Sequence, residues 1–83
     1  DDMAVGGYFH CLAAGLTPRR DIALFGFNGL DIAAALPLRL STVRTNRMLI
    51  GERAAAALVA SAERPDAREI IDTGYVLEAG ETA

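Results

Sequence analysis

Polar side chains that could hold a small ligand follow two short segments of the sequence that read as strands. Asn28 comes after the apolar run at 22–27, and Thr45 and Arg47 come after the segment at 40–44. If these segments are parallel neighbours, their carboxyl ends meet at one edge of a sheet, which is where open α/β sheets bind ligands. Amide, hydroxyl and guanidinium groups together suit a polyhydroxylated ligand, and a guanidinium suits one that carries a carboxylate. The alternative is that Asn28 serves a turn and Arg47 is a solvated residue of a helix.

The residue types that most often perform catalysis lack the partners that catalysis requires. Ser41 and Ser61 do not lie in a Gly-x-Ser-x-Gly turn. His10 is the single histidine and lies in an apolar segment, where a buried or interface histidine is commoner than a catalyst. Cys11 is the single cysteine, so it forms neither an intrachain disulfide nor a cysteine-based metal site. We therefore expect no catalytic residue, no metal site and no cofactor.

The segment at 22–29 is the one around which we expect the rest of the fold to be arranged. Its apolar run fits a strand buried on both faces, as in a parallel sheet, and Gly26 and Gly29 allow a sharp turn where it ends. Residues 30–36 then predict one or two helical turns, which Pro37 stops. The second strand is expected at 40–44, where β-branched residues alternate with others.

Two longer helices are expected to accompany these strands. The first spans 3–16, with Asp1 and Asp2 as caps and Gly15 at its end. The second spans 47–63 and is the clearest helix of the sequence, with one stripe of small and apolar residues at helical spacing: Ile50, Ala54, Ala57, Leu58 and Ser61.

The remaining segments complete half of a parallel α/β domain. Short strands are expected at 69–72 and 75–78, and residues 80–83 read as a frayed tail. The first helix is unusual because 3–16 holds no formally charged residue, whereas a surface helix normally has a polar side. We expect one face of it to pack on the sheet and the other on a partner subunit. The alternative is burial within one larger domain.

Composition excludes several other classes of protein. The chain has 83 residues, 52% of them hydrophobic, without an apolar stretch long enough for a membrane span. A net charge of −3 and no basic cluster beyond Arg19 and Arg20 argue against nucleic-acid binding by this segment. The sequence begins without a charged leader or cleavage site, so we expect it to be the C-terminal part of a longer protein.

Several motifs resemble those of the lactose-repressor (LacI/GalR) family, and together they extend over essentially the whole chain. Asp-Asp-Met-Ala-Val-Gly at 1–6 resembles the family's Asn-Asp-x-x-Ala-x-Gly signature. The segment at 14–27 resembles its Gly-Leu-x-Val-Pro-x-Asp-Ile-x-Val-x-Gly-Phe-Asp motif, and 37–43 resembles Pro-x-Leu-Thr-Thr-Val. Ile50-Gly51 with Ala54 matches Ile-Gly-x-x-Ala.

The details resemble the gluconate-repressor branch of that family. This branch has Gly-Phe-x-Gly-x-Asp-Ile, as at 26–32, Thr-x-Arg, as at 45–47, and Asp-x-Gly-[Phe/Tyr], as at 72–75. The resemblance implies an α/β, periplasmic-binding-protein-like (type I) fold, in which 1–83 forms the C-terminal portion of a sugar effector-binding and dimerisation domain, with a parallel sheet flanked by helices. The N-terminal subdomain and the helix-turn-helix DNA-binding domain are then expected outside this sequence.

The implied function is effector sensing and dimerisation in a cytoplasmic repressor that responds to a sugar acid such as gluconate. The resemblance also implies that the protein is not an enzyme, needs no cofactor, does not contact a membrane, and binds operator DNA only through a domain outside this chain. A periplasmic sugar-binding protein of a transporter is the alternative with the same fold.

The resemblance also implies roles for individual residues. Asn28 occupies a position that hydrogen-bonds the sugar and is Asp in many members, so the change removes a negative charge that would repel an anion. Thr45 and Arg47 are at positions that face the cleft, and Phe27 borders it. The family dimerises through the first helix and the segment around residue 36, which makes Val5, Tyr8, Phe9 and Leu36 the expected interface residues.

Overall fold

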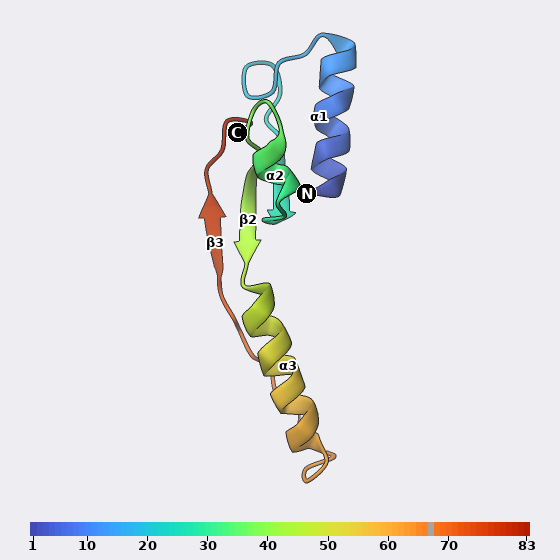
Figure 1. The fold of residues 1–83 in the computed structure, drawn as a ribbon, viewed down its shortest axis with the longest axis vertical. Helices are drawn as coiled ribbons and strands as arrows, with labels where there is room; N and C mark the ends of the chain where they lie inside the picture. Colours follow the sequence, from blue (N-terminus) through green and yellow to red (C-terminus); the bar gives the residue numbers. More distant parts are fainter. Residues whose placement is uncertain (67) are drawn as a thin grey trace.

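The computed structural model describes residues 1–66 and 68–83. In chain order its elements are α1 (Asp2–Ala14), β1 (Phe25–Asn28), α2 (Ile32–Ala35), β2 (Ser41–Thr45), α3 (Arg47–Ser61) and β3 (Tyr75–Glu78). The molecule is elongated, with extents of 58 × 19 × 18 Å. Figure 1 shows α1 and α2 beside the sheet at one end and α3 projecting at the other.

The three strands form one sheet in the order β1-β2-β3. β1 and β2 are parallel, as predicted, with Phe25 opposite Ser41 and Asn28 opposite Arg44. β3 returns antiparallel to β2, so the sheet is mixed and not the wholly parallel one that was expected. The α/β class is confirmed. The strand expected at 69–72 is wrong, since the chain enters β3 only after a turn in which Asp72 accepts the amide of Gly74 at 2.8 Å.

The long helices begin and end close to where the sequence predicts. α1 ends at Ala14 and is followed by the cap residue Gly15, which takes the left-handed conformation with φ 73° that glycine adopts readily. α3 begins at Arg47, because the side chain of Asn46 caps it by accepting the amide of Leu49 at 3.1 Å. The capping role predicted for Asp1 is wrong: this residue stands at the N-cap of α1, but its side chain makes no cap hydrogen bond and turns toward the sheet.

The core joins α1, α2 and the start of β2. Tyr8 is 1% exposed and its hydroxyl accepts the amide of Leu38 at 3.2 Å, while Leu36 is 8% exposed. Both side chains are therefore buried in the core of the chain itself, and their expected place in a dimer interface stays a prediction. The cluster consists of Tyr8, Ala33, Leu36 and Leu40, with Ala4, Val5, Leu24 and Leu38 packed against it.

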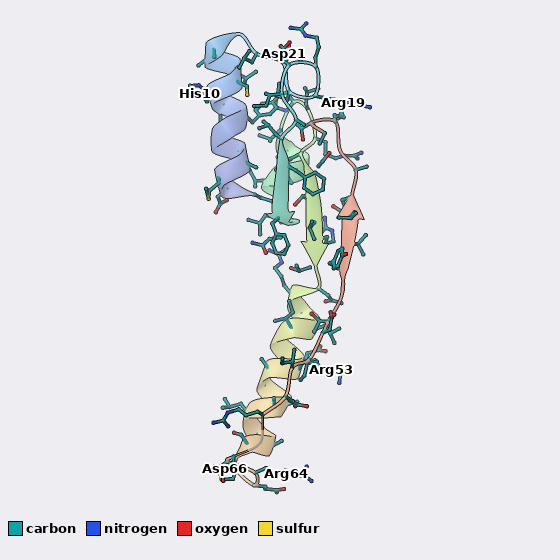
Figure 2. All side chains as sticks on the ribbon, turned by 180° about the vertical axis from the view of Figure 1, so that it is seen from behind. His10, Arg19, Asp21, Arg53, Arg64 and Asp66 are labelled. Atoms are coloured by element: carbon teal, nitrogen blue, oxygen red, sulfur yellow. The ribbon has the colours of Figure 1, made fainter. Side chains whose placement is uncertain are left out.

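One face of the sheet is covered and the other is open. On the covered face, Thr42 of β2 lies between Gly26 of β1 and Glu78 of β3 and is 1% exposed. On the opposite face Phe27 and Leu77 flank Val43 and are 55% and 65% exposed. The expectation that the first strand is buried on both faces is therefore wrong for this chain. The stripe of small and apolar residues on α3 is likewise uncovered, since no residue of this fully described helix is buried. Its side chains stand in the open in Figure 2.

The C-terminal segment docks on the sheet, so its prediction as a frayed tail is wrong. Thr82 is fully buried; its hydroxyl accepts the amide of Ser41 at 3.0 Å and donates to the carbonyl of Leu24 at 2.8 Å. The amide of Leu24 in turn donates to the carbonyl of Thr82 at 2.9 Å. These contacts tie the segment to the amino-terminal side of β1 and β2.

Candidate ligand-binding site

A hollow of about 560 Å³ lies where β2 passes into α3 and is lined by residues 44–48 and 73–76. Thr45 is the last residue of β2 and Arg47 the first of α3, so the strand end and the capped helix start place both side chains at this hollow. The opposite wall is the start of β3, where Tyr75 pairs with Thr45. The structure therefore brings together two of the four residues expected to bind the effector.

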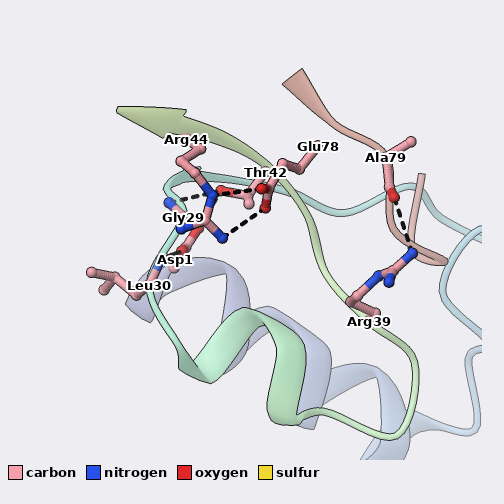
Figure 3. Close-up of polar contacts among 8 residues, drawn as sticks. All are labelled: Asp1, Gly29, Leu30, Arg39, Thr42, Arg44, Glu78 and Ala79. Atoms are coloured by element: carbon pink, nitrogen blue, oxygen red, sulfur yellow. Dashed lines mark hydrogen bonds and ion pairs between the residues drawn. The ribbon is translucent and has the colours of Figure 1, made fainter. Parts of the chain in front are cut away.

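The charges around the hollow are of one sign. Among its described lining residues two are arginines, Arg44 and Arg47, and none is acidic. The guanidinium of Arg44 is held by Glu78, with Nε–Oε1 at 2.5 Å and Nη2–Oε2 at 2.9 Å (Figure 3). This hydrogen-bonded ion pair raises the pKa of Arg44 and lowers the pKa of Glu78. Arg47 forms no ion pair with any described residue, so its charge is free to meet an anion.

Hydroxyl groups stand beside these cations. Thr45, Thr73 and Tyr75 all line the hollow, and Tyr75 is 70% exposed. A guanidinium next to several hydroxyls can bind a carboxylate and a chain of hydroxyl groups at the same time. Thr73, Tyr75 and Arg44 were not expected at the site, because their place depends on the antiparallel return of β3 and on pairing with Glu78.

The other two expected residues lie in a second hollow. Phe27 and Asn28 border a space of about 420 Å³ at the end of β1, together with residues of the first turn of α1. The two hollows are related through Arg44, which borders the first one and pairs in register with Asn28. Asn28 has φ 103° and the following Gly29 has φ 65°, so the chain turns away sharply where β1 ends. Asparagine tolerates this region better than most residues.

Asp1 and Thr42 hold that turn, and sequence reasoning missed both. The Asp1 carboxylate accepts the amide of Leu30 at 2.6 Å and the hydroxyl of Thr42 at 2.6 Å. The Thr42 hydroxyl accepts the amide of Gly29 at 3.3 Å (Figure 3). No local pattern links position 1 to positions 30 and 42. The one indirect sign in the sequence is the glycine at position 26. The Asp1 carboxylate lies against this glycine, and a Cβ there would collide with it.

The residues expected at a dimer interface divide between core and surface. Val5 is half-buried against the core, whereas Phe9 is 55% exposed and stands edge-on to the ring of Tyr8, with centroids 6.0 Å apart. Other apolar side chains of α1 and its end are also exposed, namely Met3, Leu12 and Leu16. The spacing of Phe9, Leu12 and Leu16 places these three on one face, so an uncovered apolar surface lies along the second half of the helix.

Two negative observations apply to residues 1–66 and 68–83. No group of three or more histidine, cysteine, aspartate and glutamate side chains is placed to hold a metal ion. None of the helices in this part of the chain combines the length and apolar character that crossing a bilayer requires.

Comparison with curated proteins finds transcriptional regulators. The chain is 36% identical over 81 residues to the HTH-type transcriptional regulator GntR of Escherichia coli (strain K12), covering 96% of this chain and 24% of that protein. It is 37% identical over 83 residues to GntR of Pseudomonas aeruginosa, covering 99% and 24%. It is 44% identical over 59 residues to the lactose operon repressor of Rhizobium radiobacter, covering 71% and 52%. No family model matches the chain.

Solved structures show the same relationship. A LacI regulator from Lactobacillus casei with bound Tris superposes with a TM-score of 0.82 at 24% identity, over 100% of this chain and 29% of that one. A LacI-family transcriptional regulator from Silicibacter pomeroyi gives a TM-score of 0.66 at 31% identity, over 95% and 24%.

The fold is thus the α/β, periplasmic-binding-protein-like fold of these regulators. The chain belongs to the LacI family of transcriptional regulators, and it matches a C-terminal part of its relatives. It spans about a quarter of the length of the GntR proteins.

Proposed function

We propose that this chain is the effector-sensing and dimerising part of a LacI-family repressor that responds to a sugar acid such as gluconate. The names of its relatives support the regulatory role, since they are transcriptional regulators and a repressor and not enzymes. In this proposal the N-terminal subdomain and the helix-turn-helix domain belong to other segments of the protein. Operator DNA is bound there, in the cytoplasm, and not by this chain.

The observation that carries the sugar-acid proposal is the composition of the hollow. Two arginines and three hydroxyl side chains surround it, with no acidic residue among the described lining residues. Arg47 binds the carboxylate of the effector, because its guanidinium offers a planar fork of donors and is not occupied by a described acid. Thr45 and Tyr75 meet the hydroxyl groups, and Asn28 contributes a neutral amide from the end of β1.

The open apolar surfaces fit a chain that is part of a larger sensor. Phe27 and Leu77 expose one face of the sheet, and Leu58 and Val59 of α3 are 74% and 76% exposed. Apolar surface of this extent is normally covered, since strands of parallel sheets are usually buried on both faces. In the proposed protein the remaining subdomain covers α3 and the open face of the sheet.

The outer surface of α1 is the proposed homodimer contact. Phe9 is the exposed member of the residues expected there, and Tyr8 supports its ring from within the core. Met3, which is 93% exposed, lies on the same helix, whose residues 3–14 carry no formal charge. A second copy of α1 would remove the Phe9 side chain from water.

A periplasmic sugar-binding protein is the alternative with the same fold. The curated relatives do not favour it, because the proteins that match over almost the whole chain are HTH-type transcriptional regulators. A helix-turn-helix upstream in the same protein supports the repressor, and a signal peptide in that place supports the alternative.

Calorimetric titration of the full-length protein with gluconate and with glucose tests the proposal. We expect saturable binding of gluconate that Arg47→Ala weakens by at least about 2 kcal/mol, the lower end for a desolvated charge pair. Arg53→Ala is the matched control, because Arg53 is exposed on the same helix and does not line the hollow (Figure 2). Tight binding of glucose that Arg47→Ala leaves unchanged would refute the sugar-acid proposal.

A further inference from the structure

The carboxylate of Asp1 is placed to hold a turn and not a helix. A capping side chain accepts an amide from its own helix, but Asp1 makes no such bond. Its two oxygens accept from different elements: Oδ2 from the amide of Leu30 and Oδ1 from the hydroxyl of Thr42, both at 2.6 Å (Figure 3). The side chain therefore joins the start of α1 to β2 and to the segment that follows β1.

Thr42 completes a short chain of hydrogen bonds. Its hydroxyl donates to Asp1 and accepts the amide of Gly29 at 3.3 Å, so its one proton and a lone pair are both used. The residue is 1% exposed, which removes water as a substitute partner. Loss of the hydroxyl would leave the buried Gly29 amide without an acceptor, and it would remove one donor from the partly buried Asp1 carboxylate.

The backbone that these bonds hold is the one that carries Asn28. Asn28 has φ 103°, a conformation that a residue with a side chain keeps only where the surroundings enforce it, and the following Gly29 has φ 65°, which glycine adopts readily. The two amides that follow Asn28, those of Gly29 and Leu30, are the ones that Thr42 and Asp1 accept. Packing adds to the restraint, because a Cβ on Gly29 would lie 3.0 Å from Cα of Arg44 and one on Gly26 would lie 2.9 Å from Cδ2 of Leu40.

We infer that Asp1 and Thr42 are positioning residues for the effector: they fix the turn that presents Asn28 and fasten this turn to the first turn of α1. The inference rests on the proposed function, in that Asn28 contacts the ligand. In this inference Thr42 and Asp1 act through Asn28, and of the two only Asp1 borders the hollow that Asn28 borders. They set the direction of the Asn28 amide before the ligand arrives, so that binding does not have to order the turn.

A double-mutant cycle separates positioning from general support of the fold. Gluconate affinity of the full-length protein is measured for the wild type, Asn28→Ala, Thr42→Val and the double variant. If Thr42 acts through Asn28, Thr42→Val lowers the affinity about tenfold alone and less than about twofold in the Asn28→Ala background, because coupled residues are not additive. Thr42→Ser, which keeps the hydroxyl, should restore affinity to within about threefold of the wild type.

The contrary results are equally definite. An equal loss for Thr42→Val in both backgrounds, or no loss in either, would overturn the inference. If Thr42→Val does not fold, Asp1→Asn replaces it in the cycle, since an amide has one acceptor oxygen for the two donors that Asp1 now satisfies. If the wild type binds glucose and not gluconate, the sugar-acid proposal fails and the cycle is measured with glucose. If the wild type binds neither sugar, the positioning role is overturned together with the proposed function.

Discussion

Replacing Thr82 with valine should destabilise the protein strongly, although the two side chains have nearly the same shape. The hydroxyl of Thr82 accepts the amide of Ser41 and donates to the carbonyl of Leu24, and Thr82 is fully buried. Valine would leave both backbone groups without a partner. Each unsatisfied buried group costs about 1–3 kcal/mol, so we expect the two together to lower the free energy of unfolding by about 2–6 kcal/mol.

Urea unfolding of the full-length protein measures this loss, and hydrogen exchange locates it. The amide of Ser41 should exchange much faster in Thr82→Val, because it loses its acceptor. Thr82→Ser is the matched control: it keeps both hydrogen bonds and removes one methyl group, which costs about 1 kcal/mol. An unfolding free energy within about 0.5 kcal/mol of the wild type, with the Ser41 amide still protected, would refute the assignment of these two bonds.

Two further predictions concern the surface. Because Arg44 holds the pKa of Glu78 below its ordinary value of 4.5, their pair stabilises the folded chain above that pH, and the contribution is lost as the pH falls through the lowered pKa. Glu78→Gln should therefore lessen the decline of the unfolding midpoint below about pH 4.5, and an identical decline in both proteins would contradict it. Phe9→Asp should convert the proposed dimer to a monomer in sedimentation velocity, since it places a charge on the exposed apolar surface of α1; a dimer of unchanged affinity would exclude Phe9 from the contact.

Local signals in the sequence were sufficient for most of the elements. Gly15 and Asn46 mark the end of α1 and the start of α3 by their own backbone and side-chain chemistry. The apolar run before Asn28 predicts β1, and the parallel pairing with β2 follows from the short helix between them. These features depend on a few neighbouring residues, so a single sequence reveals them.

What the sequence did not reveal depends on contacts between distant residues. The apolar character of Tyr8 and Leu36 is the same whether they meet a core or a partner, and only the fold shows that they meet each other. Thr82 looks like an ordinary polar residue near the end of the sequence, yet it is held by groups 41 and 58 positions away. The roles expected for Asn28, Thr45, Arg47 and Phe27 remain predictions, which the titrations test.

The way in which α3 leaves the sheet has a mechanical consequence. This helix of 15 residues is about 22 Å long, at 1.5 Å per residue. The chain passes from the sheet into α3 at Thr45 and returns to the sheet at Tyr75, and the hollow lies between these two passages. A rotation of about 5° there would swing the far end of the helix by about 2 Å, in the manner of a hinge. A ligand that contacts both the junction of β2 with α3 and the start of β3 would set the angle of the helix to the sheet. A small adjustment around a bound carboxylate would then displace the distant end of α3.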